Sequence, residues 1–135
     1  MSNPGTGAII GRPTHRRTFG LDPQGLARRV VDIASDKQAV DVVMLDLQGV
    51  SLIADYFVIF SGTSERQIKA LTDEIVESLN REEKLKPRHR EGEPDSGWVL
   101  LDYGGVIVHI FSPEVRDFYR LEKIWSMAVP VLRIA

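Results

Sequence analysis

The amino-acid sequence predicts one α/β domain in which helices flank a mixed β-sheet. Two apolar runs, residues 41–47 and 56–61, are continuous rather than alternating, which is typical of strands buried on both faces. An amphipathic pattern with apolar residues at spacings of three and four follows over residues 64–80 and predicts a helix. Two further apolar runs, 98–102 and 106–111, are separated by a glycine-containing turn and predict a hairpin.

Length and composition agree with a single domain. The chain has 135 residues, and a hydrophobic content of 43% is sufficient for one core. Residues 1–21 are rich in Gly, Pro, Thr and Arg and lack periodicity, so they predict a disordered basic arm, either solvated or in weak contact with RNA. We expect the folded domain to span residues 22–127 and a short C-terminal tail to occupy residues 128–135.

The charge distribution favours a protein partner over nucleic acid. The formal net charge is −2, but Arg12, Arg16 and Arg17 lie in the first 21 positions, which contain no acidic residue. The remainder therefore carries 14 basic against 19 acidic residues, a charge of −5. Because nucleic acids are bound through cations, we expect no direct sequence-specific contact with nucleic acid.

Cysteine content and hydropathy exclude several other classes of protein. The chain contains no cysteine, so it has neither a disulfide framework nor a thiolate metal site. No apolar run approaches the roughly 20 residues that span a bilayer, and the N-terminus lacks the pattern of a signal peptide. We therefore expect a cytoplasmic protein without a membrane partner.

The helices have recognisable start signals. Asp22 followed by Pro23 predicts the N-terminus of a first helix, which ends near Lys37. Ser64 and Gln67 have the spacing of a capping box at the start of the second helix. The apolar faces consist of Leu26, Val30, Ile33 and Ala34 in the first helix and of Ile68, Leu71, Ile75 and Leu79 in the second.

The second half of the chain is predicted to add three strands and a helix. The charged segment 81–97 contains a short strand at 85–89 and then a surface loop. The hairpin strands are joined by residues 103–105, in which glycines supply positive φ. Pro113 begins a last helical segment, and Pro130 ends it.

A loop at Ser61–Ser64, between a strand and a helix, is a place where many proteins hold phosphate. It lacks the glycine spacing and the lysine of a P-loop. Nucleotidyl transfer also needs paired carboxylates for two magnesium ions, whereas Asp46 and Asp102 are single acids on their strands. A nucleotide-binding or nucleotidyltransferase-like enzyme using this loop is the alternative function.

The histidines do not form a recognisable catalytic or metal site. His15 and His89 lie in the arm and in a charged segment, and His109 lies in the middle of a strand. No cysteine or carboxylate stands at ligand spacing from them, so we expect no metal and no cofactor.

The hairpin provides a candidate partner-binding surface. Alternation along its first strand divides the side chains between two faces, with Trp98, Leu100 and Asp102 on one and Val99, Leu101 and Tyr103 on the other. The few predicted helices leave part of one face open, and an exposed apolar patch of this kind is typical of a protein-binding site.

Three segments, Asp55–Leu71, Glu91–Phe111 and Arg116–Trp125, resemble the signature blocks of the ribosomal silencing factor family, also called Iojap-like. The resemblance runs from about Leu26 to Trp125. It implies a nucleotidyltransferase-like topology without catalytic carboxylates and a protein that is not an enzyme. The implied function is to bind the large ribosomal subunit through its ribosomal protein number fourteen. The resemblance further implies that the bound domain sterically blocks joining with the small subunit and so represses translation.

The resemblance also indicates which residues dock. The family block that begins with tryptophan and ends with aspartate matches Trp98 to Asp102, so we expect Trp98 to be the apolar anchor and Asp102 the charge partner. Members usually carry aspartate where this chain has Gly105. The same surface is expected to support a homodimer off the ribosome. The expected docking residues are Trp98, Leu100, Asp102, Tyr103, His109, Arg116 and Tyr119.

Overall fold

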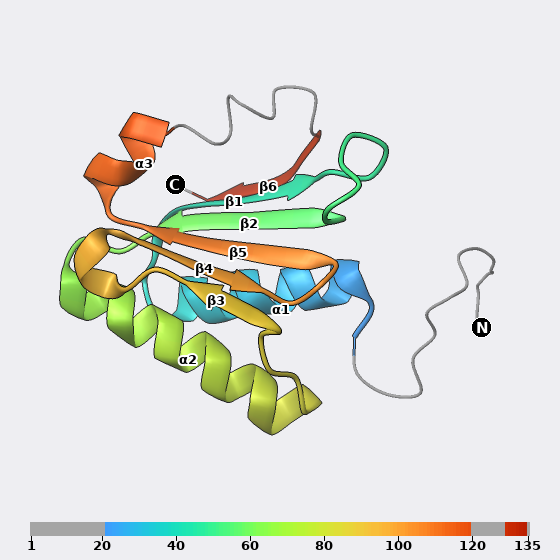
Figure 1. Ribbon diagram of the computed structural model, residues 1–135, viewed down its shortest axis with the longest axis horizontal. Coiled ribbons are helices and arrows are strands. Elements are labelled where there is room, and N and C mark those ends of the chain that lie inside the picture. Colours follow the sequence, from blue (N-terminus) through green and yellow to red (C-terminus); the bar gives the residue numbers. More distant parts are fainter. Residues whose placement is uncertain (1–20, 120–128, 135) are drawn as a thin grey trace.

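A computed structural model describes residues 21–119 and 129–134, in which helices flank a six-stranded sheet (Figure 1). The helical elements are α1 (Pro23–Asp36), α2 (Glu65–Glu83), the 3-10 turn η1 (Pro94–Ser96) and α3 (Pro113–Tyr119). The strands are β1 (Val40–Asp46), β2 (Tyr56–Ser61), β3 (His89–Glu91), β4 (Trp98–Asp102), β5 (Val106–Phe111) and β6 (Val129–Ile134). The predicted α/β class is confirmed. The basic arm predicted at residues 1–21 lies outside the described residues except for Leu21.

The sheet is mixed, as predicted. Its strand order is β3-β4-β5-β2-β1-β6, and β2 pairs with β5 in parallel while the other neighbours are antiparallel. Both β2 and β5 are buried along their whole length, which explains their continuous apolar sequences. The nucleotidyltransferase-like topology stays a prediction.

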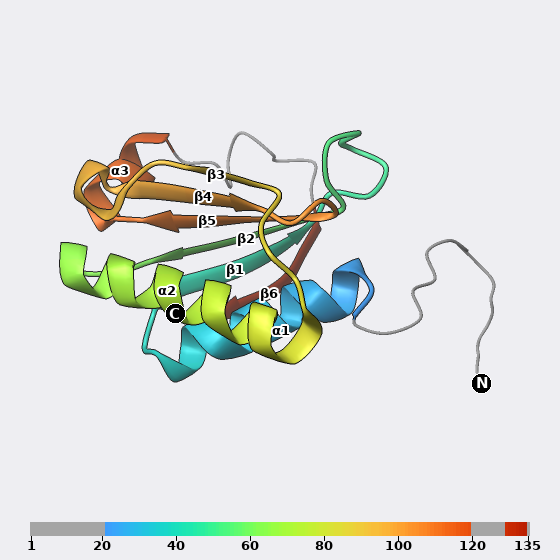
Figure 2. The ribbon, with the colours of Figure 1, turned by 60° about the horizontal axis from the view of Figure 1, so that its bottom comes forward.

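One face of the sheet is covered by α1 and α2, which lie side by side (Figure 2). Their apolar stripes bury residues such as Val30 and Leu71 against Phe60 and its neighbours in the sheet. Arg29 of α1 donates two hydrogen bonds, of 2.8 and 2.7 Å, to the Glu82 carboxylate of α2. Of the described helices, none combines the length and the apolar character needed to cross a membrane.

Both predicted helix starts are confirmed. The Asp22 carboxylate accepts a 2.8 Å hydrogen bond from the Gly25 amide, and Pro23 follows at the first helical position. The Ser64 hydroxyl accepts a 3.0 Å hydrogen bond from the Gln67 amide. Leu21 also packs against the core, and the predicted boundary of the domain at residue 22 stays a prediction.

Removal of the cap on α2 gives a stability prediction. Ser64→Ala is expected to lower the free energy of unfolding by about 1 kcal/mol, because the Gln67 amide loses its acceptor. Ser64→Asp keeps an acceptor at the cap and is the matched control. Urea titrations of the three proteins check the prediction, which fails if the two variants lose equal stability.

The opposite face of the sheet carries a second apolar cluster, and the candidate docking residues Trp98 and Leu100 pack against it. It joins residues of the four central strands β1, β2, β5 and β4 with Val115 of α3, and Figure 1 places α3 on the side of the sheet away from α1 and α2. The cluster consists of Val43, Leu45, Leu47, Ala54, Phe57, Ile59, Ile107 and Phe111, with Trp98, Leu100 and Val115 packed against it.

The strand predicted at residues 85–89 is displaced. Lys84 ends α2 in the left-handed conformation with φ 57°, and Leu85 packs against the first core. Residues 84–88 therefore cross from the helix layer to the sheet, and strand pairing begins where His89 lies opposite Asp102. The predicted bounds were wrong because the apolar Leu85 packs against the core from the connection after α2, before strand pairing begins.

The C-terminal tail predicted at 128–135 contains a strand. β6 pairs with β1, with Leu45 opposite Pro130 and Met44 opposite Leu132. The register shifts between Met44 and Leu45, and a proline is tolerated at such an irregularity on an edge strand. Pro130 was therefore wrongly interpreted as the end of a helix, and residues 120–128 lie outside the described part of the chain.

Candidate docking surface

The two faces of β4 have different environments, as the alternation predicted. Val99 and Leu101 are fully buried in the core beneath α1 and α2, whereas Trp98 and Leu100 are half-buried against the second cluster. A half-buried tryptophan has one part of its ring packed and another part accessible to a partner. Trp98 and Leu100 therefore begin the candidate site.

A groove of about 420 Å³ opens beside these two side chains. It is bounded by β3, η1, β4 and α3, and its lining is Glu91, Gly92, Ser96, Trp98, Leu100 and Val115. Gly92 has φ 82°, and a Cβ there would lie 2.0 Å from the Trp98 carbonyl oxygen. Only glycine lets the chain after β3 pass so close to the backbone of the tryptophan.

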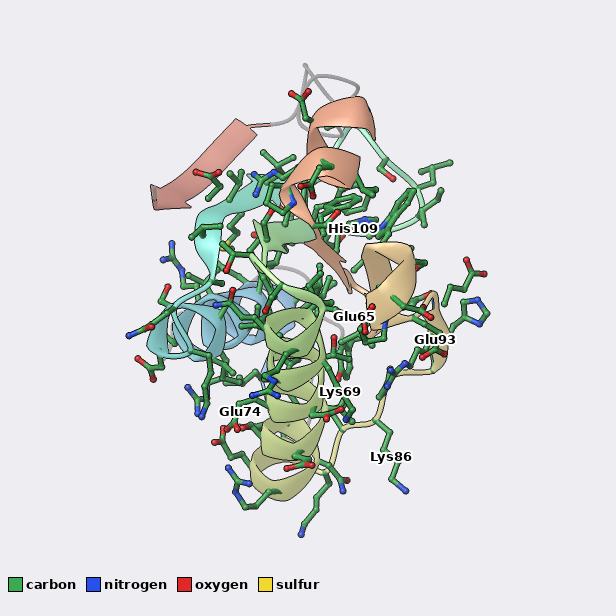
Figure 3. The ribbon with its side chains drawn as sticks, turned by 90° about the vertical axis from the view of Figure 1, so that its left-hand side faces the viewer. Glu65, Lys69, Glu74, Lys86, Glu93 and His109 are labelled. Atoms are coloured by element: carbon green, nitrogen blue, oxygen red, sulfur yellow. The ribbon has the colours of Figure 1, made fainter. Side chains whose placement is uncertain are left out.

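His109 lies directly behind the groove and not on the surface. It is 4% exposed, and its Nδ1 accepts a 3.2 Å hydrogen bond from Trp98 Nε1. Its ring meets Phe57 edge-on at a centroid distance of 4.6 Å and is parallel to Phe111 at 6.0 Å. In Figure 3, His109 lies inside the molecule, whereas Lys86 points away from it. Burial lowers the pKa of His109 to about 4.

Asp102 has a local structural role. Its Oδ1 accepts a 2.7 Å hydrogen bond from the Gly104 amide and lies 3.3 Å from Arg88 Nε. Gly104 takes φ 93°, as predicted for this turn, but Gly105 does not take positive φ. The carboxylate therefore caps the hairpin turn at the far end of β4 from Trp98.

Tyr103 is not brought together with Trp98. It packs against the core on the helix-covered face, and its buried hydroxyl has no hydrogen-bond partner among the described residues. Burial raises the pKa of Tyr103 to about 12. Trp98 and Tyr103 lie on opposite faces because side chains alternate with a period of two along a strand, and the docking role of Tyr103 stays a prediction.

Arg116 is buried and connects α3 to the sheet. Its Nη1 donates to the Asp41 carbonyl oxygen and lies 3.4 Å from the Ser61 hydroxyl. Through these contacts it fixes the start of α3, which carries the groove residue Val115. Tyr119 is the last residue of α3, and its side chain lies outside the described part of the structure.

The Ser61–Ser64 loop uses its polar groups internally. The Gln67 side-chain oxygen accepts from the Thr63 amide at 2.7 Å and lies 3.0 Å from the Thr63 hydroxyl, while Ser64 caps α2. The adjoining groove of about 330 Å³ is lined by the acids Glu65, Asp95 and Glu114, which repel phosphate. In residues 21–119 and 129–134, no three His, Cys, Asp or Glu side chains are grouped so as to hold a metal.

Three groove residues escaped the sequence analysis, namely Gly92, Ser96 and Val115. Val115 lies in the helical segment predicted to begin at Pro113, but no local pattern indicates which strand that segment packs against. Gly92 and Ser96 belong to a charged loop, and their position beside Trp98 depends on how β3 and η1 pack against β4.

Comparison with known proteins shows the family of the chain. The sequence model of a family described as "ribosomal silencing factor during starvation" matches residues 21–134. A ribosomal silencing factor of Zymomonas mobilis is 42% identical over 106 residues, covering 78% of this chain and 79% of the relative. A mouse protein named "mitochondrial assembly of ribosomal large subunit protein 1" is 31% identical over 103 residues, covering 73% of this chain and 44% of its own length.

A solved structure gives the same fold. The crystal structure of a Chromobacterium violaceum protein superposes with a TM-score of 0.74 at 28% identity, covering 78% of this chain and 88% of the other. These matches define the class as a regulatory, ribosome-associated factor. The chain belongs to the ribosomal silencing factor family.

Proposed function

We propose that this protein binds the large ribosomal subunit through the groove beside Trp98 and sterically blocks joining with the small subunit. Its contact there is ribosomal protein number fourteen, and it acts in the cytoplasm. The observation that best supports this proposal is the half-buried Trp98, which lines an open groove together with Leu100 and Val115. Aromatic residues anchored in such grooves supply much of the affinity of protein interfaces.

Charge supports a basic protein partner. Glu91 lines the groove, and the sequence after residue 21 has a formal charge of −5. Opposite charge on a ribosomal protein would steer its approach and favour this partner over an acidic one. The name of the mouse relative refers to the large ribosomal subunit, which supports the choice of subunit.

The test uses purified bacterial large and small ribosomal subunits. The protein is expected to co-sediment with large subunits and not with small ones, and to reduce the yield of joined ribosomes in proportion to its occupancy. Serum albumin at equal concentration is the control for non-specific effects. Co-sedimentation with large subunits that leaves joining unchanged would contradict the steric mechanism, and absence of co-sedimentation would contradict the binding itself.

We also propose that the free protein forms a homodimer through the same face, because this face exposes part of Trp98 and Leu100. Multi-angle light scattering is expected to report a dimer for the wild type and a monomer for Trp98→Ala. A dimer that survives this substitution would place the interface elsewhere.

We propose that repression needs no catalysis. The polar groups of the Ser61–Ser64 loop are committed to the α2 cap, and the neighbouring groove is acidic. Isothermal titration calorimetry with ATP and excess Mg²⁺ is therefore expected to give no saturable heat. A stoichiometric binding isotherm that disappears in Thr63→Val would instead establish the nucleotide-binding alternative.

A further inference from the structure

His109 and Trp98 are diagonal neighbours on one face of the β4–β5 pair. Trp98 lies opposite Phe111, and Leu100 lies opposite His109. The imidazole of His109 is therefore displaced by two residues along β5 from the position directly opposite the indole. The 3.2 Å hydrogen bond from Trp98 Nε1 to His109 Nδ1 links the groove to a residue that the partner cannot reach.

The direction of this bond fixes the form of the imidazole. An indole N–H can only donate, so Nδ1 must present a lone pair and the ring proton resides on Nε2. Nε2 is buried and has no hydrogen-bond partner among the described residues. The bond therefore exists only with neutral imidazole, and the buried site disfavours the charged form.

The imidazole is itself held by its neighbours. Phe57 meets it edge-on at 4.6 Å and Phe111 lies parallel to it at 6.0 Å, while Phe111 also contacts Trp98 at 4.9 Å. Rotation of the imidazole would displace these rings in a closely packed interior. Nδ1 is consequently a fixed acceptor, and the indole that bonds to it has one preferred orientation.

We propose that His109 is a positioning residue whose neutral imidazole holds the Trp98 indole in the orientation that lines the docking groove. This inference rests on the proposed function, because it assumes that Trp98 meets the ribosomal partner. A side chain already ordered in the free protein loses less conformational entropy on binding. His109 therefore contributes to affinity without touching the partner.

The test is a double-mutant cycle with His109→Phe, which keeps an aromatic ring but removes the acceptor. Affinity for large subunits is measured for the wild type, His109→Phe, Trp98→Ala and the double variant. His109→Phe is expected to weaken binding about 3- to 10-fold in the wild type and to have no further effect beside Trp98→Ala. Equal losses in both backgrounds, or none in the wild type, would overturn the positioning role.

A second measurement needs no change at His109. Hydrogen exchange of the Trp98 indole N–H, distinguished from that of Trp125 with Trp125→Phe, is expected to be at least tenfold slower than in an unfolded peptide. Exchange as fast as in the peptide would contradict the bond. If Trp98→Ala itself binds normally, the proposed function fails; if it binds weakly but His109→Phe binds normally, only this inference fails.

Discussion

Trp98→Ala is expected to weaken binding to the large ribosomal subunit by at least about 30-fold, or about 2 kcal/mol. Trp98 combines a large apolar ring with a position in the lining of the groove, together with Leu100 and Val115. Truncation to alanine removes the anchor and leaves the pocket for it on the partner empty. Equilibrium co-sedimentation with purified large subunits measures the loss.

The matched control is Leu52→Ala, which removes an apolar side chain that is fully exposed. Leu52 precedes β2, whose first residue Tyr56 pairs with Val106, whereas Trp98 pairs with Phe111 at the other end of β5. Figure 1 accordingly shows the β1–β2 loop and α3 at opposite ends of the sheet. Leu52→Ala is expected to bind as the wild type does. A folded Trp98→Ala protein, verified by circular dichroism, that binds equally well would refute the docking assignment.

Acidification from pH 8 to pH 5 is expected to cost about 2 kcal/mol of folding stability through His109 alone. Burial lowers the pKa of His109 from 6.5 in the unfolded chain to about 4 in the folded protein. Between these two values the unfolded chain binds a proton that the folded protein does not, so stability falls as the pH falls. The loss begins near pH 6.5 and reaches its limit of about 3 kcal/mol below pH 4.

His109→Phe separates this effect from the titration of carboxylates. Both proteins lose stability in acid as groups such as Glu82, whose pKa is lowered by the hydrogen bond from Arg29, become protonated. Only the wild type carries the additional loss from His109. Urea titrations at pH 8, 6.5 and 5 are expected to show a shallower pH dependence in the variant, and parallel curves would contradict the assignment to His109.

Local sequence patterns correctly predicted the features that depend on interactions between residues close together in the chain. The continuous apolar run of β2 was placed at residues 56–61, and the caps at Asp22 and Ser64 were located from residue type and spacing. The alternation along β4 correctly separated Trp98 and Leu100 from Val99 and Leu101. These features are set either by the alternation of side chains along a strand or by a hydrogen bond between residues close together in the sequence.

Features that depend on contacts between segments far apart in the sequence could not be predicted from local patterns. A proline in a short apolar run favours the end of an element, and only pairing with β1 makes Pro130 part of a strand. Leu85 was predicted to begin a strand, but it packs against the core from the connection between α2 and β3. Asp102 stays a predicted charge partner, and the structure adds the contacts of its Oδ1 with the Gly104 amide and Arg88.

The sequence by itself determined the α/β class, the central strands, the helix starts and the family blocks. These features depend on the types and spacing of residues that lie close together in the sequence. Only the tertiary structure decided which expected docking residues meet. It placed Trp98 and Leu100 in one groove with Val115, Tyr103 on the other face, and His109 and Arg116 inside. The physical reason is that burial and the indole–imidazole bond depend on β4 pairing with β5, a relation between segments that no local pattern records.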